Sequence, residues 1–153
     1  MPTSSCRYLA EEGLASLPAR QQDIQTPCGV YDGMVGLKDE DICAVSIVRA
    51  GDSLQSIVRE LIPACSVGKI LIQRDEDHPE KIAKLFYAKL GPRVAKQHVL
   101  LCDPMVATGG SSAKAVEVLK EAGVEESNIT FLCILAAPEG IVKLRTKFPA
   151  CVM

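Results

Sequence analysis

The sequence has no tryptophan, and it has only three tyrosines and three phenylalanines among its 153 residues. Aromatic platforms on which a single nucleic-acid strand could stack are therefore scarce. Neither sign of charge dominates, because 17 Lys and Arg residues stand against 19 Asp and Glu residues, for a formal net charge of −2. This balance gives no electrostatic reason to expect nucleic acid or an anionic membrane as a partner.

Targeting and metal-binding signals are also absent. No apolar run is long enough to cross a bilayer, and the polar Met1–Ser5 segment lacks the apolar centre of a signal peptide. The seven cysteines are odd in number, and no two have the C-x-x-C spacing of a zinc cage. Cys43, Cys102 and Cys133 lie inside apolar runs, where a reduced thiol acts as a small hydrophobe. We therefore expect a cytoplasmic protein in a reducing compartment.

Four near-continuous apolar runs predict buried strands of a mostly parallel sheet. These runs are Ile42–Val48, Val67–Gln73, His98–Cys102 and Ile129–Ala136. Helical patterns fall between or after them, at Ser53–Ile62, Ala113–Ala122 and Gly140–Lys147. Asp52 or Ser53 is expected to cap the first of these helices, and Gly123 to end the second. The alternation predicts an α/β fold with right-handed crossovers and helices on both faces of the sheet.

The N-terminal part is less regular. Cys6–Leu17 is expected to form a helix, and the Pro- and Gly-punctuated Gln25–Leu37 segment a hairpin or arm. We predict one domain, in which residues 1–40 form the N-terminal helix and β-arm and residues 41–153 form the core. The segment Ala150–Met153 is typical of the opening of a further strand.

The most informative segment is His98–Ala115, in which an apolar strand leads into Asp103 and a Gly-rich turn leads into a helix. Free N–H groups at a helix N-terminus bind anions, and Gly109 and Gly110 permit close backbone approach by phosphate. The Thr108–Ser112 hydroxyls add donors. On this short motif alone, an ordinary helix cap fits as well as a phosphate site. A Walker loop and a dinucleotide fingerprint are both excluded, because K-S/T and G-x-G-x-x-G are absent.

The segment DPMVATGGS at Asp103–Ser111 resembles the phosphoribosyl-pyrophosphate loop of uracil phosphoribosyltransferases, in the type I phosphoribosyltransferase family. Asp103-Pro104 matches the Asp-Pro of this branch, where most type I enzymes have two acidic residues, while Val106 replaces the usual Leu. VRAG at Val48–Gly51, GKILIQRDE at Gly68–Glu76 and AAPEGI at Ala136–Ile141 resemble further family segments in the same order. QTPCGVYDG and YAKL resemble the arm and a later strand.

This resemblance implies a glycosyltransferase of pyrimidine salvage that converts uracil and phosphoribosyl pyrophosphate to UMP and pyrophosphate. Asp103 is then the candidate catalytic residue. The resemblance implies phosphoribosyl-pyrophosphate binding by Arg49, Ala50, Gly51, Arg74, Asp103, Pro104, Met105, Val106, Ala107, Thr108, Gly109, Gly110 and Ser111. Guanidinium groups suit phosphate oxygens because they offer paired donors and stay charged. Catalysis by positioning and electrostatic stabilisation would need no covalent nucleophile.

Several roles stay open at this point. Asp75 and Glu76 could orient Arg74, bind Mg²⁺ through water, or form a solvated acidic loop, and Glu139 could face the ribose or cap a helix. The resemblance further implies Mg²⁺ as cofactor and a homodimer. It also suggests GTP as a possible activator, although no residue here carries that expectation. The metal ligands are not assigned.

The family's pattern continues beyond this sequence with a strand and a Gly-rich base-binding segment, and no uracil-binding residue is identified here. We therefore describe the resemblance as C-terminally shortened, lacking the usual C-terminal strand. Two hypotheses follow: an enzyme of the family, or a non-catalytic phosphoribosyl-pyrophosphate-binding homologue or partner subunit. UMP formation by the purified chain distinguishes them.

Overall fold

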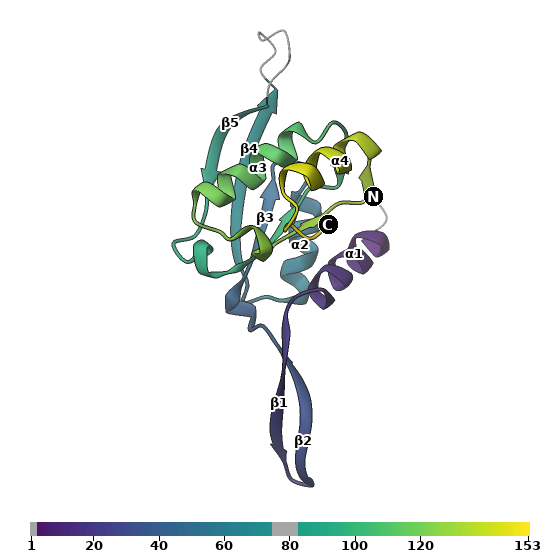
Figure 1. Cartoon of the computed structure of the whole chain (residues 1–153), viewed down its shortest axis with the longest axis vertical. Coiled ribbons are helices and arrows are strands. Elements are labelled where there is room, and N and C mark those ends of the chain that lie inside the picture. Colours follow the sequence, from purple (N-terminus) through teal and green to yellow (C-terminus); the bar gives the residue numbers. More distant parts are fainter. Residues whose placement is uncertain (1–2, 75–82) are drawn as a thin grey trace.

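A computed structural model describes residues 3–74 and 83–153 of the chain. Its centre is a five-stranded sheet of order β5-β4-β3-β6-β8, of which Figure 1 labels β5, β4 and β3. The strands are β3 (Ile42–Ile47), β4 (Ser66–Arg74), β5 (Ala83–Lys89), β6 (His98–Cys102) and β8 (Ile129–Leu132). Every neighbouring pair is parallel except β4 and β5, which are antiparallel. The predicted mostly parallel α/β sheet is therefore confirmed.

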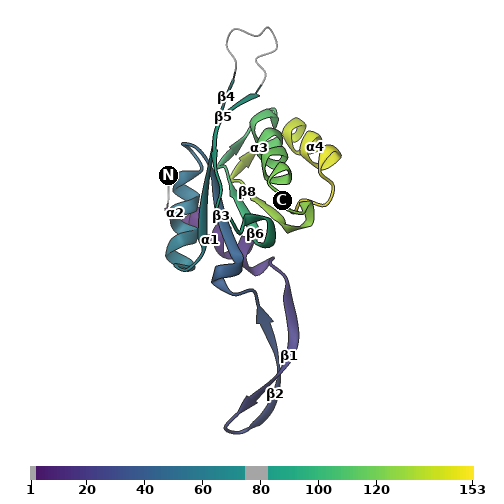
Figure 2. The same cartoon turned by 90° about the vertical axis from the view of Figure 1, so that its left-hand side faces the viewer.

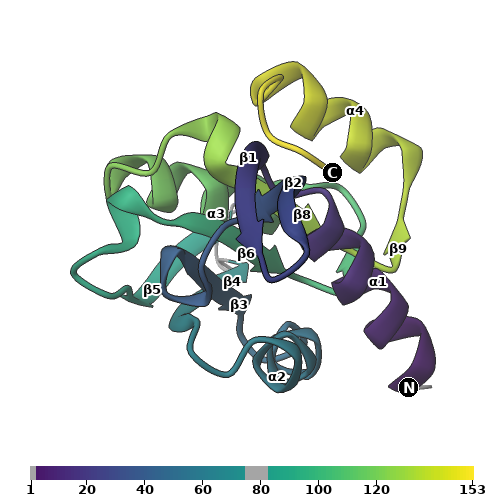
Figure 3. The ribbon, with the colours of Figure 1, turned by 90° about the horizontal axis from the view of Figure 1, so that it is seen from below.

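Helices cover both faces of this sheet, as predicted (Figure 2). They are α1 (Thr3–Ala15), α2 (Asp52–Leu61), α3 (Gly110–Glu121) and α4 (Pro138–Lys147). One core cluster joins α1 and α2 to residues such as Ala44 and Leu100, and the other joins α3 and α4 to residues such as Val45 and Leu101. Because side chains alternate along a strand, neighbouring residues of β3 and β6 fill the two opposite cores. Figure 3 shows α2 and α4 on opposite sides of the sheet.

A two-stranded arm projects from one end of this body (Figures 1 and 2). Its strands, β1 (Ala19–Thr26) and β2 (Gly29–Gly36), are antiparallel, and both are largely exposed. Gly29 at the tip has φ +125°. A short 3₁₀ turn, Asp39–Asp41, then leads into the amino end of β3. The arm therefore leaves the body at the end of the sheet opposite to the carboxyl ends of the parallel strands.

The apolar run Ile129–Ala136 does not form one strand. It divides into β8 and a separate β9 (Leu135–Ala136), which pairs with β7 (Met105–Val106). The Pro104 carbonyl accepts the N–H groups of both Ile134 and Leu135 at 3.1 Å, and so draws the chain away from β6. This small second ladder carries the segment after Asp103 away from the sheet edge.

Five further observations bear on the sequence predictions. Gly123 has φ +89° and ends α3, as expected. Neither Asp52 nor Ser53 caps α2, because Gly51 takes the N-cap position and no side chain makes a cap hydrogen bond there. All seven cysteines are free, and Val152 forms a parallel bridge with Thr130 of β8. In the part of the chain that the structure describes, no helix combines the length and apolar character that a membrane span requires.

Candidate active site

Asp103 lies immediately after β6 and is 8% exposed. Its backbone N–H donates to the Leu132 carbonyl at 3.1 Å, and its Oδ1 accepts the Met105 N–H at 3.4 Å. Burial raises the pKa of the Asp103 carboxyl from 3.8 to about 6, and the Met105 N–H opposes this shift. At neutral pH most of the carboxyl is still ionised, so it can accept hydrogen bonds from hydroxyl groups.

The Gly-rich turn delivers the N-terminus of α3 to the same place. Gly109 is the N-cap and has φ +72°, a left-handed conformation that a residue with a Cβ rarely adopts. The first N–H groups of α3, on Gly110, Ser111 and Ser112, have no acceptor within the helix because no earlier turn exists. No side chain caps this helix. The arrangement therefore favours anion binding over the simple capping role that the sequence left open.

These elements surround an open cavity of about 270 Å³. Its lining residues are Ala50, Asp103, Met105, Val106, Ala107, Thr108, Gly109, Gly110, Ser111 and Ser112. Thr108 is exposed and Ser111 is half-buried, so both hydroxyls are accessible at the helix end. The structure thus brings most of the predicted loop residues to one concave surface. Pro104 is buried and does not line the cavity.

The Val48–Gly51 loop follows β3 and reaches the same cavity. A Cβ added to Gly51 would lie 2.1 Å from the Cys102 carbonyl oxygen, so only glycine lets this loop pack against the end of β6. Ala50 consequently lines the cavity beside Asp103. Arg49 is exposed, and the Val48–Arg49 peptide bond is cis. Arg49 makes no ion pair within the described ranges 3–74 and 83–153.

The remaining candidates are placed only in part. Arg74 is the last residue of β4, the neighbour of β3, but its side chain lies outside the described residues. Asp75 and Glu76 also lie outside them. Glu139 is exposed in the first turn of α4, whose N-cap is Ala137, and no side chain makes a cap hydrogen bond there. Glu139 is therefore not a hydrogen-bonding cap, although its charge suits the helix dipole.

Ser112 was named among the hydroxyl donors of the motif but was absent from the binding set implied by the resemblance. It is 2% exposed as a whole residue and still contributes to the cavity lining. The sequence places it in the first turn of α3, but only the packed structure shows that this turn faces the cavity. Gly140 was quoted only as part of a motif, yet a Cβ there would lie 2.4 Å from the Ala107 carbonyl oxygen. The start of α4 therefore packs against the Gly-rich turn at Ala107.

The chemistry of the site is compatible with a magnesium ion that arrives with its substrate. Over residues 3–74 and 83–153, no group of three or more His, Cys, Asp or Glu side chains is arranged to hold a metal. Asp103 supplies one carboxylate at the cavity. Mg²⁺ is commonly held by one or two carboxylates together with substrate phosphates rather than by a cage of protein ligands.

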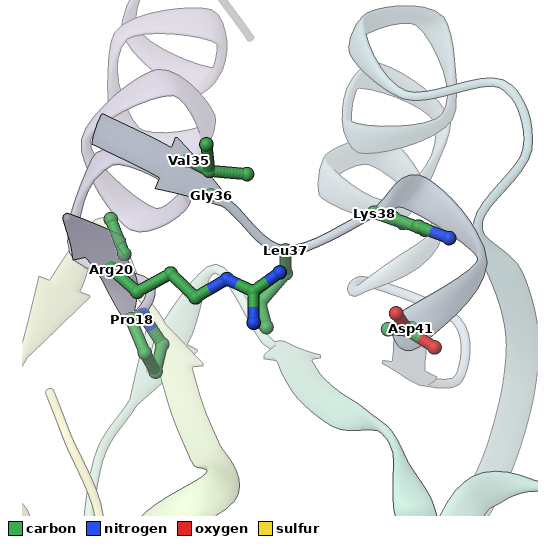
Figure 4. Close-up of a pocket in the computed structure, with 8 residues that line it drawn as sticks. Pro18, Arg20, Val35, Gly36, Leu37, Lys38 and Asp41 are labelled. Carbon is green, nitrogen blue, oxygen red and sulfur yellow. The ribbon is translucent and has the colours of Figure 1, made fainter. Parts of the chain in front are cut away.

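A second cavity, of about 400 Å³, lies at the root of the arm (Figure 4). Arg20 extends across it near Leu37, and Lys38 and Asp41 lie on its other side. Its charges are mixed, and Asp41 is paired with Arg93 at 3.4 Å. It lacks the free helix N-terminus of the first cavity. We therefore place the candidate active site at the Asp103–Ser112 cavity.

A mostly parallel sheet carries a strand-end carboxylate, a Gly-rich turn and a helix N-terminus at its carboxyl edge, where α/β proteins bind ligands. The chain shares this α/β fold with purine and adenine phosphoribosyltransferases of known structure. The solved structure of the AQ2163 protein from Aquifex aeolicus superposes with a TM-score of 0.77 and 26% identity, and covers 96% of this chain and 68% of that one.

Sequence comparison makes the assignment specific. The uracil phosphoribosyltransferase family model matches residues 3–153, and the chain belongs to that family. It is 49% identical over 144 residues to uracil phosphoribosyltransferase of Dictyostelium discoideum and 43% identical over 143 residues to that of Saccharomyces cerevisiae. Each match covers 94% of this chain and 65% of the relative, so the chain spans about two thirds of the length of these relatives.

Proposed function

We propose that this protein acts as a uracil phosphoribosyltransferase, joining uracil to the ribose C1 of phosphoribosyl pyrophosphate with release of pyrophosphate. The observation that carries the proposal is the cavity in which the Asp103 carboxylate and the N-terminus of α3 face the same space. A protein that binds a sugar phosphate needs an acceptor for hydrogen bonds from the sugar hydroxyls and a site for the phosphate anion. The two must be close enough for a single sugar phosphate to reach both. Family membership makes uracil the acceptor base of choice.

In the proposed reaction, the chain's own residues bind and orient the donor. The N–H groups of Gly110–Ser112 and the Thr108 and Ser111 hydroxyls hold phosphate oxygens. The Asp103 carboxylate accepts hydrogen bonds from the ribose hydroxyls. The loop at Ala50-Gly51, together with Arg49, faces the pyrophosphate. Negative charge grows on the departing pyrophosphate as the bond to C1 breaks. Fixed N–H and guanidinium groups therefore stabilise the transition state more than they stabilise bound phosphoribosyl pyrophosphate. Mg²⁺, the proposed cofactor, supplies positive charge to that leaving group when bound.

The test is UMP formation from radiolabelled uracil, phosphoribosyl pyrophosphate and Mg²⁺. We expect UMP from the wild-type protein and at least a hundredfold loss in an Asp103→Asn variant, which keeps the shape of the side chain but removes its charge. Donor binding without UMP would favour the non-catalytic alternative. Absence of donor binding would contradict both. Omitting Mg²⁺ should abolish turnover, and adding GTP to the same assay tests the proposed activation.

We further propose that the protein works in the cytoplasm as a homodimer. Support comes from the arm, which projects from the body and exposes Val30, Tyr31 and Met34 at 67%, 64% and 68%. Side chains of this size on an isolated two-stranded ribbon are typical of a surface that another molecule covers. Sedimentation of the purified protein measures this directly.

A further inference from the structure

A charged cluster lies behind the Val48–Gly51 loop. Ser46 of β3 and Lys69 of β4 are register partners in the parallel sheet, and both donate to Asp52 Oδ1, at 2.5 and 2.6 Å. Ser46 is fully buried, whereas the Lys69 and Asp52 side chains are 40% and 41% exposed. The cluster therefore joins two strands of the sheet to the first residue of α2.

This cluster anchors the carboxyl end of the Val48–Gly51 loop, and strand β4 also anchors its amino end. The Val48 N–H donates to the Ile70 carbonyl at 2.9 Å, one residue along β4 from Lys69. Asp52 directly follows Gly51, so the Lys69 ammonium fixes the other end. Two consecutive residues of β4 thus bracket the segment that packs against β6 beside Asp103.

The charge of Asp52 matters because of its position. Burial by itself would raise the pKa of the Asp52 carboxyl, but hydrogen bonds from Lys69 and Ser46 and the charge of Lys69 bring it below its ordinary value. Asp52 is therefore ionised at neutral pH. An ionised carboxylate next to a loop that faces pyrophosphate repels that ligand unless a cation compensates it. Lys69 is the one ion-pair partner of Asp52 within residues 3–74 and 83–153.

We propose that Lys69 is a positioning residue for the pyrophosphate end of the donor: it cancels the charge of Asp52 and fixes the Val48–Gly51 loop. The inference rests on the proposed function, since it takes that loop as the pyrophosphate contact. It assigns Lys69 no contact with the reacting atoms. Lys69 is expected to affect only the pyrophosphate end of the donor. The other phosphate is bound by a different loop, at the N-terminus of α3, and its affinity should not depend on Lys69.

The experiment is calorimetric titration of the whole chain with two probes, inorganic pyrophosphate with Mg²⁺ and ribose 5-phosphate. We expect Lys69→Met to weaken pyrophosphate binding about three- to tenfold, the size expected for a half-exposed charge pair, and to leave ribose 5-phosphate binding within about twofold. Lys69→Arg keeps the charge and should stay near wild type. Lys120→Met is the matched control, because Lys120 pairs with Glu126 at 2.5 Å at the opposite end of α3.

A double variant distinguishes the effect of charge from a general loss of structure. Adding Asp52→Asn to Lys69→Met removes the uncompensated carboxylate and should restore the part of the pyrophosphate affinity that was lost to charge repulsion. Asp52→Asn alone should bind pyrophosphate within about twofold of wild type, because loss of the ion pair with Lys69 and loss of the negative charge act in opposite directions. Equal loss of both probes, an unchanged pyrophosphate affinity in Lys69→Met, or failure of Asp52→Asn to restore it would overturn the proposal. A wild-type protein that binds neither probe would instead remove the proposed function, and this inference with it.

Discussion

The arm and the central sheet are both built from β-strands, but they obtain their stability in different ways. All residues of β3 and β6 are buried, whereas Gly33 is the one buried residue of the arm strands. The sheet is enclosed by helices of the same chain, which cover its two faces. The arm has no such cover, and an isolated two-stranded ribbon is at best marginally stable in water. The core strands are thus buried within this chain, while the arm strands are exposed on almost their whole length.

The largest expected effect tests this contrast with two truncations. Leu100→Ala, at a fully buried site in β6, should lower the free energy of unfolding by about 2–5 kcal/mol, because the deleted methyl groups leave a cavity. Val30→Ala on the arm, where the side chain is 67% exposed, should change it by less than about 0.5 kcal/mol under monomeric conditions. Urea denaturation of both variants makes the comparison. Similar losses would mean that the arm is part of the folded core.

The carboxyl edge of the sheet adds a packing requirement at Gly51. Gly51→Ala should destabilise the protein by about 2 kcal/mol, since the new methyl group would meet the Cys102 carbonyl oxygen and force the loop to move. Because the displaced loop lies beside Asp103, affinity for phosphoribosyl pyrophosphate should fall in the same variant. Gly36→Ala is the control, as a Cβ there meets nothing within 4 Å. Equal stability of the two variants would show that the loop does not pack as described.

The buried carboxyl of Asp103 is expected to lower the stability of the protein at neutral pH. Its pKa in the folded protein, about 6, lies above the ordinary 3.8, so ionisation costs more in the folded state than in the unfolded state. Stability from this group is therefore full below about pH 4 and is lost as the pH rises through about 6. Asp103→Asn should raise the free energy of unfolding at pH 7 by roughly 1–2 kcal/mol while it weakens binding of phosphoribosyl pyrophosphate at least tenfold.

Thermal unfolding of wild type and Asp103→Asn across pH 4 to 8 measures this difference. The gain should vanish near pH 4, where the wild-type carboxyl is protonated. Donor affinity of the wild type should rise over the same interval, with a midpoint near pH 6. A variant that is less stable than wild type at pH 7 would show that the buried carboxylate is not a cost to the fold.

The smallest expected effect on the free energy of unfolding belongs to the arm surface. Met34→Lys should change it by no more than about 0.5 kcal/mol, because Met34 is 68% exposed. The same change should shift the protein from dimer toward monomer, since a charge would then lie in the proposed contact. Sedimentation velocity at several concentrations measures the shift, with Lys84→Glu on β5 as a charge-changing control away from the arm. An unchanged sedimentation coefficient would place the contact elsewhere.

Much of the fold follows from local sequence patterns. The bounds of β6 agree with the predicted His98–Cys102 because a short apolar run is closed on both sides by polar residues. The division of Ile129–Ala136 into β8 and β9 could not be predicted, because it depends on the Pro104 carbonyl, which comes from a distant segment. The predicted capping of α2 by Asp52 was wrong for a similar reason. Lys69, 17 residues away, donates a hydrogen bond to the Asp52 carboxylate.

The candidate site shows the same division. The Asp103–Ser111 motif was visible because its spacing is local, and the sequence order of the strands placed the Arg49 loop at the same edge. The contacts that support these loops could not be predicted from the sequence. Gly140 behind Ala107 and Lys69 behind the Val48–Gly51 loop both come from other parts of the chain. Their positions depend on strand register and helix packing, which no local pattern encodes.

The most direct test of the central claim is calorimetric titration of the wild-type protein and its Asp103→Asn variant with phosphoribosyl pyrophosphate and Mg²⁺ at pH 7. We predict stoichiometric binding by the wild type and at least a tenfold weaker binding by the variant, because the ribose hydroxyls lose a charged acceptor. Equal affinity of the two proteins, or no binding by a folded wild type, would contradict the assignment of this cavity as the donor site.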